Sequence, residues 1–151
     1  MQDGAGETGT CPRPPWHLTP TLAEVRQALA GIVAEWRTRD IPPDLITRAE
    51  LVLAEVLNNV VEHAMRNVPD GRITVDWKLD SGRLVLCVTD DGRPMPDANL
   101  PSGRLPEASG TAADTPEGGY GWFLIRHLVD ALTYQRHGGT NRVSITLAPR
   151  P

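Results

Sequence analysis

Hydrophobic residues follow two different periods along this chain, helical in its first half and alternating in most of its second half. Apolar positions recur every three or four residues in two long segments, which predicts an amphipathic helix from about residue 20 to 40 and another from about 43 to 65. Thr19 or Thr21 can cap the first helix, and the Ile41-Pro-Pro43 segment ends it. The first half is therefore a pair of helices, each with one apolar face.

Alternation of apolar and polar residues then predicts strands, with turn residues between them. Asp80-Ser-Gly82 and Gly138-Gly139 are turn sequences that each separate two such strands. Helices followed by hairpins indicate an α+β fold, a two-layer sandwich with the helices on one face of a mixed, mainly antiparallel sheet. The expected elements of this half are strands over 72–79, 83–89, 132–137 and 141–148, and a helix over 120–131.

Two segments lack any period. Residues 93 to about 117 contain many Pro, Gly, Ser and Ala, which predicts a long loop of the kind that often forms a lid. Residues 1–15 are polar and rich in Gly and Pro, so we expect a flexible N-terminal tail followed by one domain over 16–151.

Charge and composition exclude several classes of function. The formal net charge is −4 and the pI is near 5.5, and no basic cluster appears, which argues against direct nucleic-acid binding. Apolar stretches are too short for a membrane helix and the N-terminus has no signal sequence, so we expect a cytoplasmic protein. Cys11, Cys87 and the four dispersed histidines form no zinc pattern.

Three short polar segments interrupt the apolar runs, and the first lies on the second predicted helix. Glu55 and Asn59 are four residues apart, so they share one helix face at the border of the apolar stripe. The Asn59 carbonyl oxygen suits Mg²⁺, and Glu55 could orient or deprotonate a nucleophile. A solvated helix edge is the alternative interpretation of this pair.

The second polar segment, Asp90-Asp-Gly92, ends a predicted strand. Asp90 would place a carboxylate at the rim of the sheet, where it can accept a hydrogen bond from an exocyclic amine such as that of adenine. Gly92 lets the backbone approach a ring closely. An ordinary Asp-Gly turn would have the same sequence.

The third polar segment, Gly118-Gly-Tyr-Gly121, comes just before an apolar helix. Its backbone amides would lie at the N-terminus of that helix, where partial positive charge favours phosphate. It is neither a Walker A loop nor a dinucleotide fingerprint, and a flexible hinge is the alternative.

In this order, the three segments resemble the motifs of the GHKL ATPase family. Glu55-x-x-x-Asn59 resembles the N box, Asp90-x-Gly92-x-Pro94 the G1 box and Gly119-x-Gly121 the G2 box, while Gly139-Thr140 resembles the family's closing Gly-Thr. The resemblance covers about residues 16–148 and implies a Bergerat ATP-binding fold. The short chain is most similar to the stand-alone anti-sigma regulatory factors, which bind ATP and Mg²⁺, hold a sigma factor and phosphorylate a Ser or Thr of an anti-anti-sigma partner of the STAS type.

That resemblance implies a role for each matched position. Asn59 would coordinate Mg²⁺, Asp90 would read adenine beside Gly92, and Glu55 would be the catalytic base. The remaining implied nucleotide contacts are Gly119, Tyr120, Gly121 and Thr140.

The resemblance also implies partners, and it leaves two functions open. A sigma factor, a STAS protein and a second copy of the chain are the expected partners. Arg93-Pro-Met-Pro96 replaces the usual glycine-rich continuation of the G1 box. The predicted lid has no lysine and has two arginines, Arg93 and Arg104, at or near its start; Arg104 could contact a phosphate or could be an ordinary loop arginine. An active Ser/Thr kinase is the first hypothesis, and an ATP-sensing binding module without kinase activity is the second. An interaction protein that binds no nucleotide is the third class to be tested.

Overall fold

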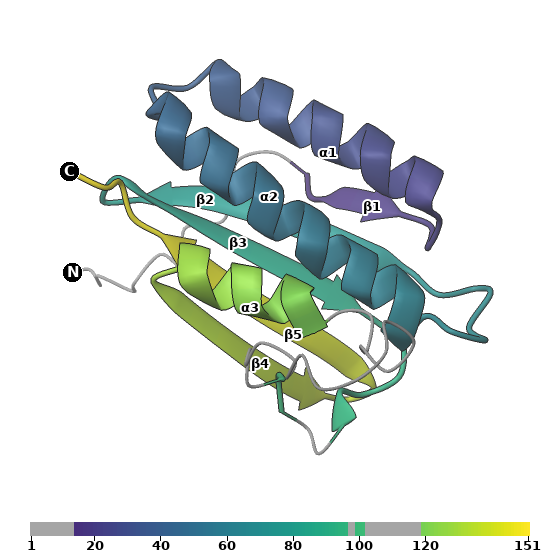
Figure 1. Ribbon diagram of the computed structural model, residues 1–151. Coiled ribbons are helices and arrows are strands. Elements are labelled where there is room, and N and C mark those ends of the chain that lie inside the picture. The colour runs from purple at the N-terminus through teal and green to yellow at the C-terminus, as the bar shows by residue number, and fades with distance from the viewer. Residues whose placement is uncertain (1–13, 97–98, 102–118) are drawn as a thin grey trace, which may run out of the picture.

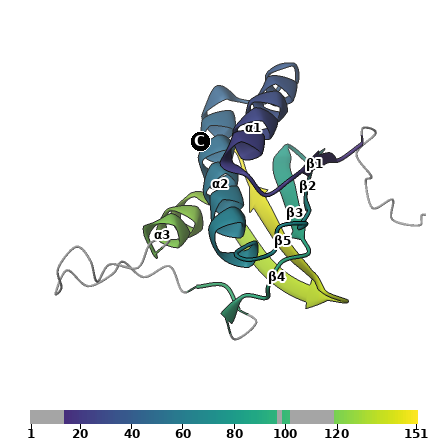
Figure 2. The same ribbon diagram turned by 90° about the vertical axis from the view of Figure 1, so that its right-hand side faces the viewer.

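The computed structural model describes residues 14–96, 99–101 and 119–151 of the chain. Three helices pack on one face of a five-stranded sheet whose order is β1-β2-β3-β5-β4, with every neighbouring pair antiparallel (Figure 1). The view turned by 90° shows the three helices on the same side of the sheet (Figure 2). The predicted two-layer α+β fold is confirmed. The elements are β1 (Trp16–Leu18), α1 (Leu22–Arg37), α2 (Pro43–Asn59), the π-helical turn η1 (Val60–Ala64), β2 (Ile73–Asp80), β3 (Arg83–Asp90), α3 (Gly119–Leu128), β4 (Ala131–His137) and β5 (Thr140–Leu147).

The two long helices begin where their local chemistry allows. The Thr21 side chain caps α1 by accepting a hydrogen bond of 3.1 Å from the Glu24 N–H. Pro43 occupies the first turn of α2, where a missing N–H costs nothing. Beyond Asn59 the helix widens into η1, in which the Met65 N–H reaches the carbonyl of Val60 at 2.9 Å. The predicted helix to about Met65 is therefore continuous in space, but its last turn is π-helical.

Both predicted hairpins are present, and tight turns close them. Ser81 and Gly82 have φ values of 53° and 80°, and Gly138 and Gly139 have 58° and 80°. Two consecutive positive φ angles are typical of the turn whose twist matches that of paired strands. These turns fix the registers that bring the ends of β3, β4 and β5 together.

The core lies between the sheet and the helices. Alternate residues of β2, β3 and β5 face the helices and are buried, as the period of two predicts. Trp36 from α1 and Trp77 from β2 meet edge to face with their ring centroids 6.2 Å apart. The fully buried large side chains include Ile32, Leu45, Leu53, Leu57, Ile73, Leu84, Leu86, Ile125, Ile145 and Leu147.

The third helix ends earlier than the sequence predicts. We expect residues 120–131 to be helical, but α3 ends at Leu128 and Ala131 already belongs to β4. The cause is long-range, because the Asp130 N–H bonds to the Thr146 carbonyl and the Asp130 carboxylate accepts the Ala148 N–H at 2.7 Å. Residues 1–13 of the expected tail, and residues 97–98 and 102–117 of the expected loop with its Arg104, lie outside the described residues. Within the described part of the chain, no helix is both long and apolar enough to span a membrane.

Candidate functional site

A cavity of about 700 Å³ opens at the end of the sheet where β3 stops and η1, α3 and the β4–β5 hairpin meet. Its volume lies within the range of ~300–1,000 Å³ that is typical of small-molecule sites. The described residues that line it are Asn59, Val60, His63, Ala64, Arg66, Asp90, Arg93, Pro94, Met95, Pro96, Pro101, Trp122, Tyr134, Asn141 and Val143. Two of the predicted site residues, Asn59 and Asp90, are therefore in the wall of one cavity.

Asp90, the last residue of β3, is a buried carboxylate with one satisfied oxygen. Its exposed fraction is 4%, and its Oδ1 accepts hydrogen bonds from the Gly92 N–H at 2.8 Å and from Asn141 Nδ2 at 2.9 Å. Oδ2 accepts no hydrogen bond from the described residues. Burial raises the pKa of Asp90, Asp91 adds to this rise, and the two hydrogen bonds and the Arg136 charge oppose it. Asp90 thus presents one free acceptor oxygen in the wall of an otherwise largely apolar cavity.

Asn141 is a site residue that the sequence does not reveal. It is directly opposite Asp90 on the neighbouring strand and opposite Arg136 on the next one. It is 3% exposed, and its two ends bond to different partners. Nδ2 donates to Asp90 Oδ1 and to the Arg93 carbonyl, whereas Oδ1 accepts from Tyr134 Oη at 2.6 Å and Arg136 Nη1 at 2.8 Å. Only the strand register, which no sequence motif encodes, could have identified it.

Glu55, Asn59 and Gly121 meet beside the cavity. A Cβ placed on Gly121 would lie 2.6 Å from Glu55 Oε2 and 3.5 Å from Asn59 Nδ2, so the first turn of α3 packs directly on this face of α2. Asn59 is 5% exposed, and its buried Nδ2 has no hydrogen-bond partner among the described residues. Glu55 is half-buried, is not among the lining residues, and makes no hydrogen bond or ion pair with the described residues. The structure therefore brings the predicted acid and amide together with Gly121.

Gly92 is required by the close approach of η1. A Cβ at this position would lie 2.4 Å from the Ala64 carbonyl oxygen, which is backbone and cannot move aside. The same carbonyl accepts a hydrogen bond of 2.8 Å from the Arg93 N–H. The π-helical turn thus holds the segment that follows β3.

That segment is fixed from its other side by the β4–β5 hairpin. Arg136 Nη1 donates to the Gly92 carbonyl at 3.0 Å, and the Met95 N–H donates to Tyr134 Oη at 3.0 Å. Asn141 Nδ2 also donates to the Arg93 carbonyl, so three side chains of the hairpin bond to the backbone of residues 92, 93 and 95. The Pro-containing sequence that replaces a glycine-rich loop is therefore held by direct hydrogen bonds.

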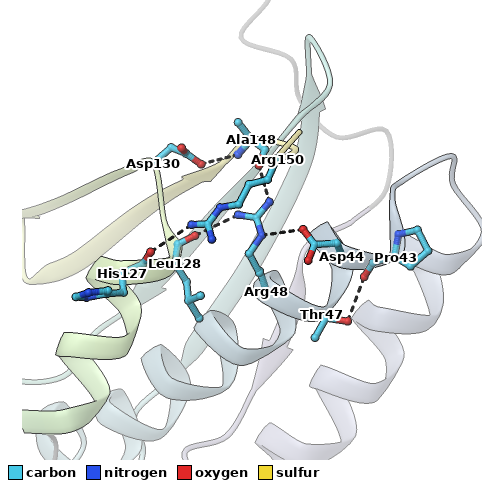
Figure 3. A network of polar contacts seen from close by, with 9 residues as sticks. All are labelled: Pro43, Asp44, Thr47, Arg48, His127, Leu128, Asp130, Ala148 and Arg150. Carbon is cyan, nitrogen blue, oxygen red and sulfur yellow. Dashed lines mark hydrogen bonds and ion pairs between the residues drawn. The ribbon is translucent and has the colours of Figure 1, made fainter.

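Both ends of α3 are docked on neighbouring elements. At its C-terminal end, the buried Arg48 of α2 donates to the Leu128 carbonyl at 3.3 Å and to the Ala148 carbonyl at 2.6 Å (Figure 3). Asp44 lies 3.3 Å from Arg48 Nε, and Arg150 donates to a further carbonyl of α3. A cation near the last carbonyls of a helix is stabilising, so this network fixes α3 relative to α2.

The remaining predicted site residues are placed differently. Gly119 and Tyr120 belong to the first turn of α3, and only their backbone is described. Thr140 is exposed at the start of β5, is paired with His137 in the hairpin, and does not line the cavity. Its neighbour Asn141 does.

The residues present fit a nucleotide with a bound cation. The free oxygen of Asp90 suits an amine donor, and the first-turn amides of α3 suit phosphate. Asn59 has an unpartnered amide whose nitrogen and oxygen exchange places by a half-turn, and Glu55 supplies a second oxygen group beside it. Among the described residues, no group of three or more His, Cys, Asp or Glu side chains is placed so that it could hold a metal ion. This donor set suits Mg²⁺, which takes few protein ligands when substrate phosphates and waters complete its shell.

Fold and site together agree with one family. The chain belongs to the histidine kinase-like ATPase domain family, whose pattern matches residues 18–147. This match confirms the resemblance that the N, G1 and G2 boxes indicate.

Similar proteins include two bacterial protein kinases and an anti-sigma factor. The serine/threonine-protein kinase BtrW of Bordetella bronchiseptica is 30% identical over 97 residues, which make up 64% of this chain and 66%, slightly under two thirds, of the relative. The serine-protein kinase RsbW of Bacillus subtilis is 26% identical over 117 residues, which cover 76% of this chain and 71% of RsbW. The anti-sigma F factor of Geobacillus stearothermophilus is 26% identical over 105 residues, which cover 70% of this chain and 68% of that relative.

Solved structures show the same fold. The histidine kinase domain of the blue-light-activated kinase EL346 from Erythrobacter litoralis has a TM-score of 0.56 at 22% identity, covering 83% of this chain and 59% of that one. The RsbU and RsbW domains of a Mycobacterium tuberculosis protein have a TM-score of 0.57 at 19% identity, and the match covers 91% of this chain and 33% of that one.

Proposed function

We propose that this chain binds ATP with Mg²⁺ and acts as a serine/threonine-protein kinase of the anti-sigma type. It would sequester a sigma factor and phosphorylate a Ser or Thr of a STAS-domain anti-anti-sigma partner. The observation that carries the proposal is the cavity wall in which buried Asp90 presents a free acceptor oxygen and Asn59 presents an unpartnered amide.

Nucleotide binding is supported at both ends of the cavity. In the proposal, Asp90 Oδ2 accepts a hydrogen bond from the exocyclic amine of adenine, and Gly92 leaves room beside the ring. Trp122 and Val143 supply apolar contact area. At the other end, Asn59 would hold Mg²⁺, and the amides of Gly119 and Gly121 would face the phosphates.

Kinase activity is supported by Glu55 and by the relatives. Mg²⁺ when bound would neutralise charge that develops during phosphoryl transfer. Glu55, which lies beside Asn59 and has no partner among the described residues, is free to accept the proton of an incoming hydroxyl group. BtrW and RsbW are named as serine or serine/threonine kinases, and the Geobacillus relative is named an anti-sigma factor.

Calorimetry with ATP and Mg²⁺ tests nucleotide binding first. We expect saturable binding by the natural chain and at least a tenfold loss in Asp90→Ala, because a hydrogen bond to a charged group contributes roughly 1.5–3 kcal/mol. Absent binding, or binding that Asp90→Ala leaves unchanged, would contradict both ATP-dependent functions.

Phosphoryl transfer is tested separately, with labelled ATP, Mg²⁺ and STAS-domain proteins from the same genome. We expect transfer to one of them, and a loss of roughly 100-fold or more in Glu55→Gln, within the usual range for a general base. Glu50→Gln makes the same change on α2 more than one turn earlier and away from the cavity lining, so it is the matched control.

The second candidate is an ATP-sensing module that inhibits a partner without phosphorylating it. It is favoured by the position of Glu55 outside the cavity lining and by the hydrogen-bonded Arg93–Met95 segment. Normal ATP binding with no transfer to any STAS protein, and with partner inhibition still dependent on ATP, would select this function over the kinase.

A further inference from the structure

The ends of three adjacent strands carry one row of polar side chains, two of which lie in the cavity wall. Asp90 of β3, Asn141 of β5 and Arg136 of β4 are directly opposite one another in the sheet register. Directly opposite residues of antiparallel strands have Cβ atoms ~4.5–5.5 Å apart, close enough for their side chains to bond. Asp90 and Asn141 line the cavity, whereas Arg136 is exposed and does not.

The Asn141 amide can adopt only one orientation in this row. Its Nδ2 faces three acceptors, Asp90 Oδ1 at 2.9 Å, the Arg93 carbonyl at 2.7 Å and the Gly92 carbonyl at 3.4 Å. Its Oδ1 faces Arg136 Nη1 at 2.8 Å. A flipped amide would place oxygen against these acceptors and N–H against a guanidinium that has only donors. Arg136 and Tyr134, which also donates to Oδ1, therefore set the direction in which Asn141 donates.

A fixed Asn141 fixes the carboxylate of Asp90 in turn. Oδ1 is engaged by Asn141 and by the Gly92 N–H, so the carboxylate cannot rotate without losing two hydrogen bonds. Oδ2 is left as an acceptor with no donor of its own among the described residues. A purine with an amine at position 6 can donate to it, whereas a carbonyl at position 6 would place two acceptors against each other.

We infer that Asn141 is a positioning residue, oriented by Arg136 and Tyr134, that locks Asp90 so that the cavity prefers 6-aminopurine over 6-oxopurine nucleotides. This inference rests on the proposed nucleotide binding and adds the residues that set the base preference. Arg136 is outside the cavity lining, so in this inference it acts through its hydrogen bonds to Asn141 and to the Gly92 carbonyl, and not by touching the base.

The test compares ATP with inosine triphosphate, which carries the same ribose and phosphates but has a carbonyl at position 6 and an N–H at position 1, where ATP has an amine and an acceptor nitrogen. Calorimetry on the full chain with Mg²⁺ gives a dissociation constant for each. We expect the natural chain to bind ATP roughly 100-fold more tightly or better, as expected for a buried polar mismatch.

Two variants then test the row. Asn141→Leu removes the donor to Asp90, and we expect the preference for ATP to shrink by about tenfold or more. Arg136→Met leaves the buried residues in place, and we expect a smaller shrinkage of roughly three- to tenfold. Arg142→Met is the matched control, because Arg142 neighbours Asn141 on β5 but is exposed on the opposite face of the sheet. The Arg142→Met variant should prefer ATP over inosine triphosphate by the same factor as the natural chain.

The possible outcomes separate the inference from the function on which it rests. If the natural chain binds neither nucleotide, the proposed function fails and the inference falls with it. If it binds both equally, or if Arg136→Met leaves the preference unchanged, the inference is wrong and ATP binding stands. Because Arg136 is exposed, that variant decides the matter even if Asn141→Leu does not fold.

Discussion

At the scale of single residues, the Asp90 carboxylate has opposite effects on the proposed ATP binding and on the stability of the empty fold. Burial raises its pKa above the ordinary value of 3.8, so the folded chain holds this proton more tightly than the unfolded chain does. The stability contributed by Asp90 is therefore fully present below about pH 3.8, falls as the pH rises through the raised pKa, and stays lower above it. At neutral pH the ionised carboxylate reduces the stability of the fold.

Asp90→Asn is predicted to stabilise the empty protein at pH 7 and to impair ATP binding. The new side chain keeps an oxygen for Gly92 and Asn141 but turns an N–H toward the amine of the base. We expect the free energy of unfolding in urea to rise by on the order of 1 kcal/mol at pH 7 and the gain to vanish toward pH 3.8. Asp40→Asn, an exposed change of the same kind, should show neither effect, and a pH-independent gain would contradict this account.

At the scale of elements, Gly92 packs against η1 and Gly121 packs against α2, and the two differ in which atoms a new side chain would contact. Gly92→Ala would press Cβ against the Ala64 backbone, so we expect a loss of several kcal/mol or a failure to fold. Gly121→Ala would meet only the tip of Glu55, which can rotate away, and alanine favours a helix over glycine by about 1 kcal/mol. We therefore expect Gly121→Ala to fold with unchanged or higher stability yet to bind Mg²⁺ and ATP more weakly. Urea unfolding and calorimetry on both variants measure these outcomes.

The position of α3 depends on Arg48, which bonds to carbonyls on two other segments. Arg48→Met keeps the volume but leaves the Leu128 and Ala148 carbonyls without this donor, so we expect the free energy of unfolding to fall by about 2 kcal/mol. Arg26→Met, on the exposed face of α1, is the matched control and should change it by less than about 0.5 kcal/mol. Equal effects of the two changes in urea unfolding would show that the network contributes little.

At the scale of the whole molecule, local patterns predicted the elements, and long-range pairing determined the remainder. The two periods of the apolar residues and the glycine turns are local signals, and the helices and hairpins they predict are present. The end of α3 and the position of Asn141 depend on contacts with residues distant in the sequence, and the spacing of apolar residues carries no information about such contacts. Neighbouring residues of β5 also differ in position, because the side chain of Thr140 is exposed at the end of the hairpin whereas that of Asn141 lies in the cavity wall.

Binding at one end of the sheet should stabilise the entire fold, because a ligand that binds only the folded chain shifts the unfolding equilibrium. At a free concentration 100 times the dissociation constant, ATP with Mg²⁺ should add ~2.7 kcal/mol. For a chain of 151 residues that corresponds to a rise in Tm of roughly 5–10 °C, measurable by thermal unfolding.

The same titration on Asp90→Asn should give a smaller rise or none, although this variant starts from the higher Tm at neutral pH. The two curves of Tm against ATP concentration should therefore cross, with the natural chain more stable once the nucleotide is in excess. Parallel curves would mean that ATP binds away from Asp90. A crossing would show that the buried charge lowers the stability of the empty fold and that nucleotide binding restores it.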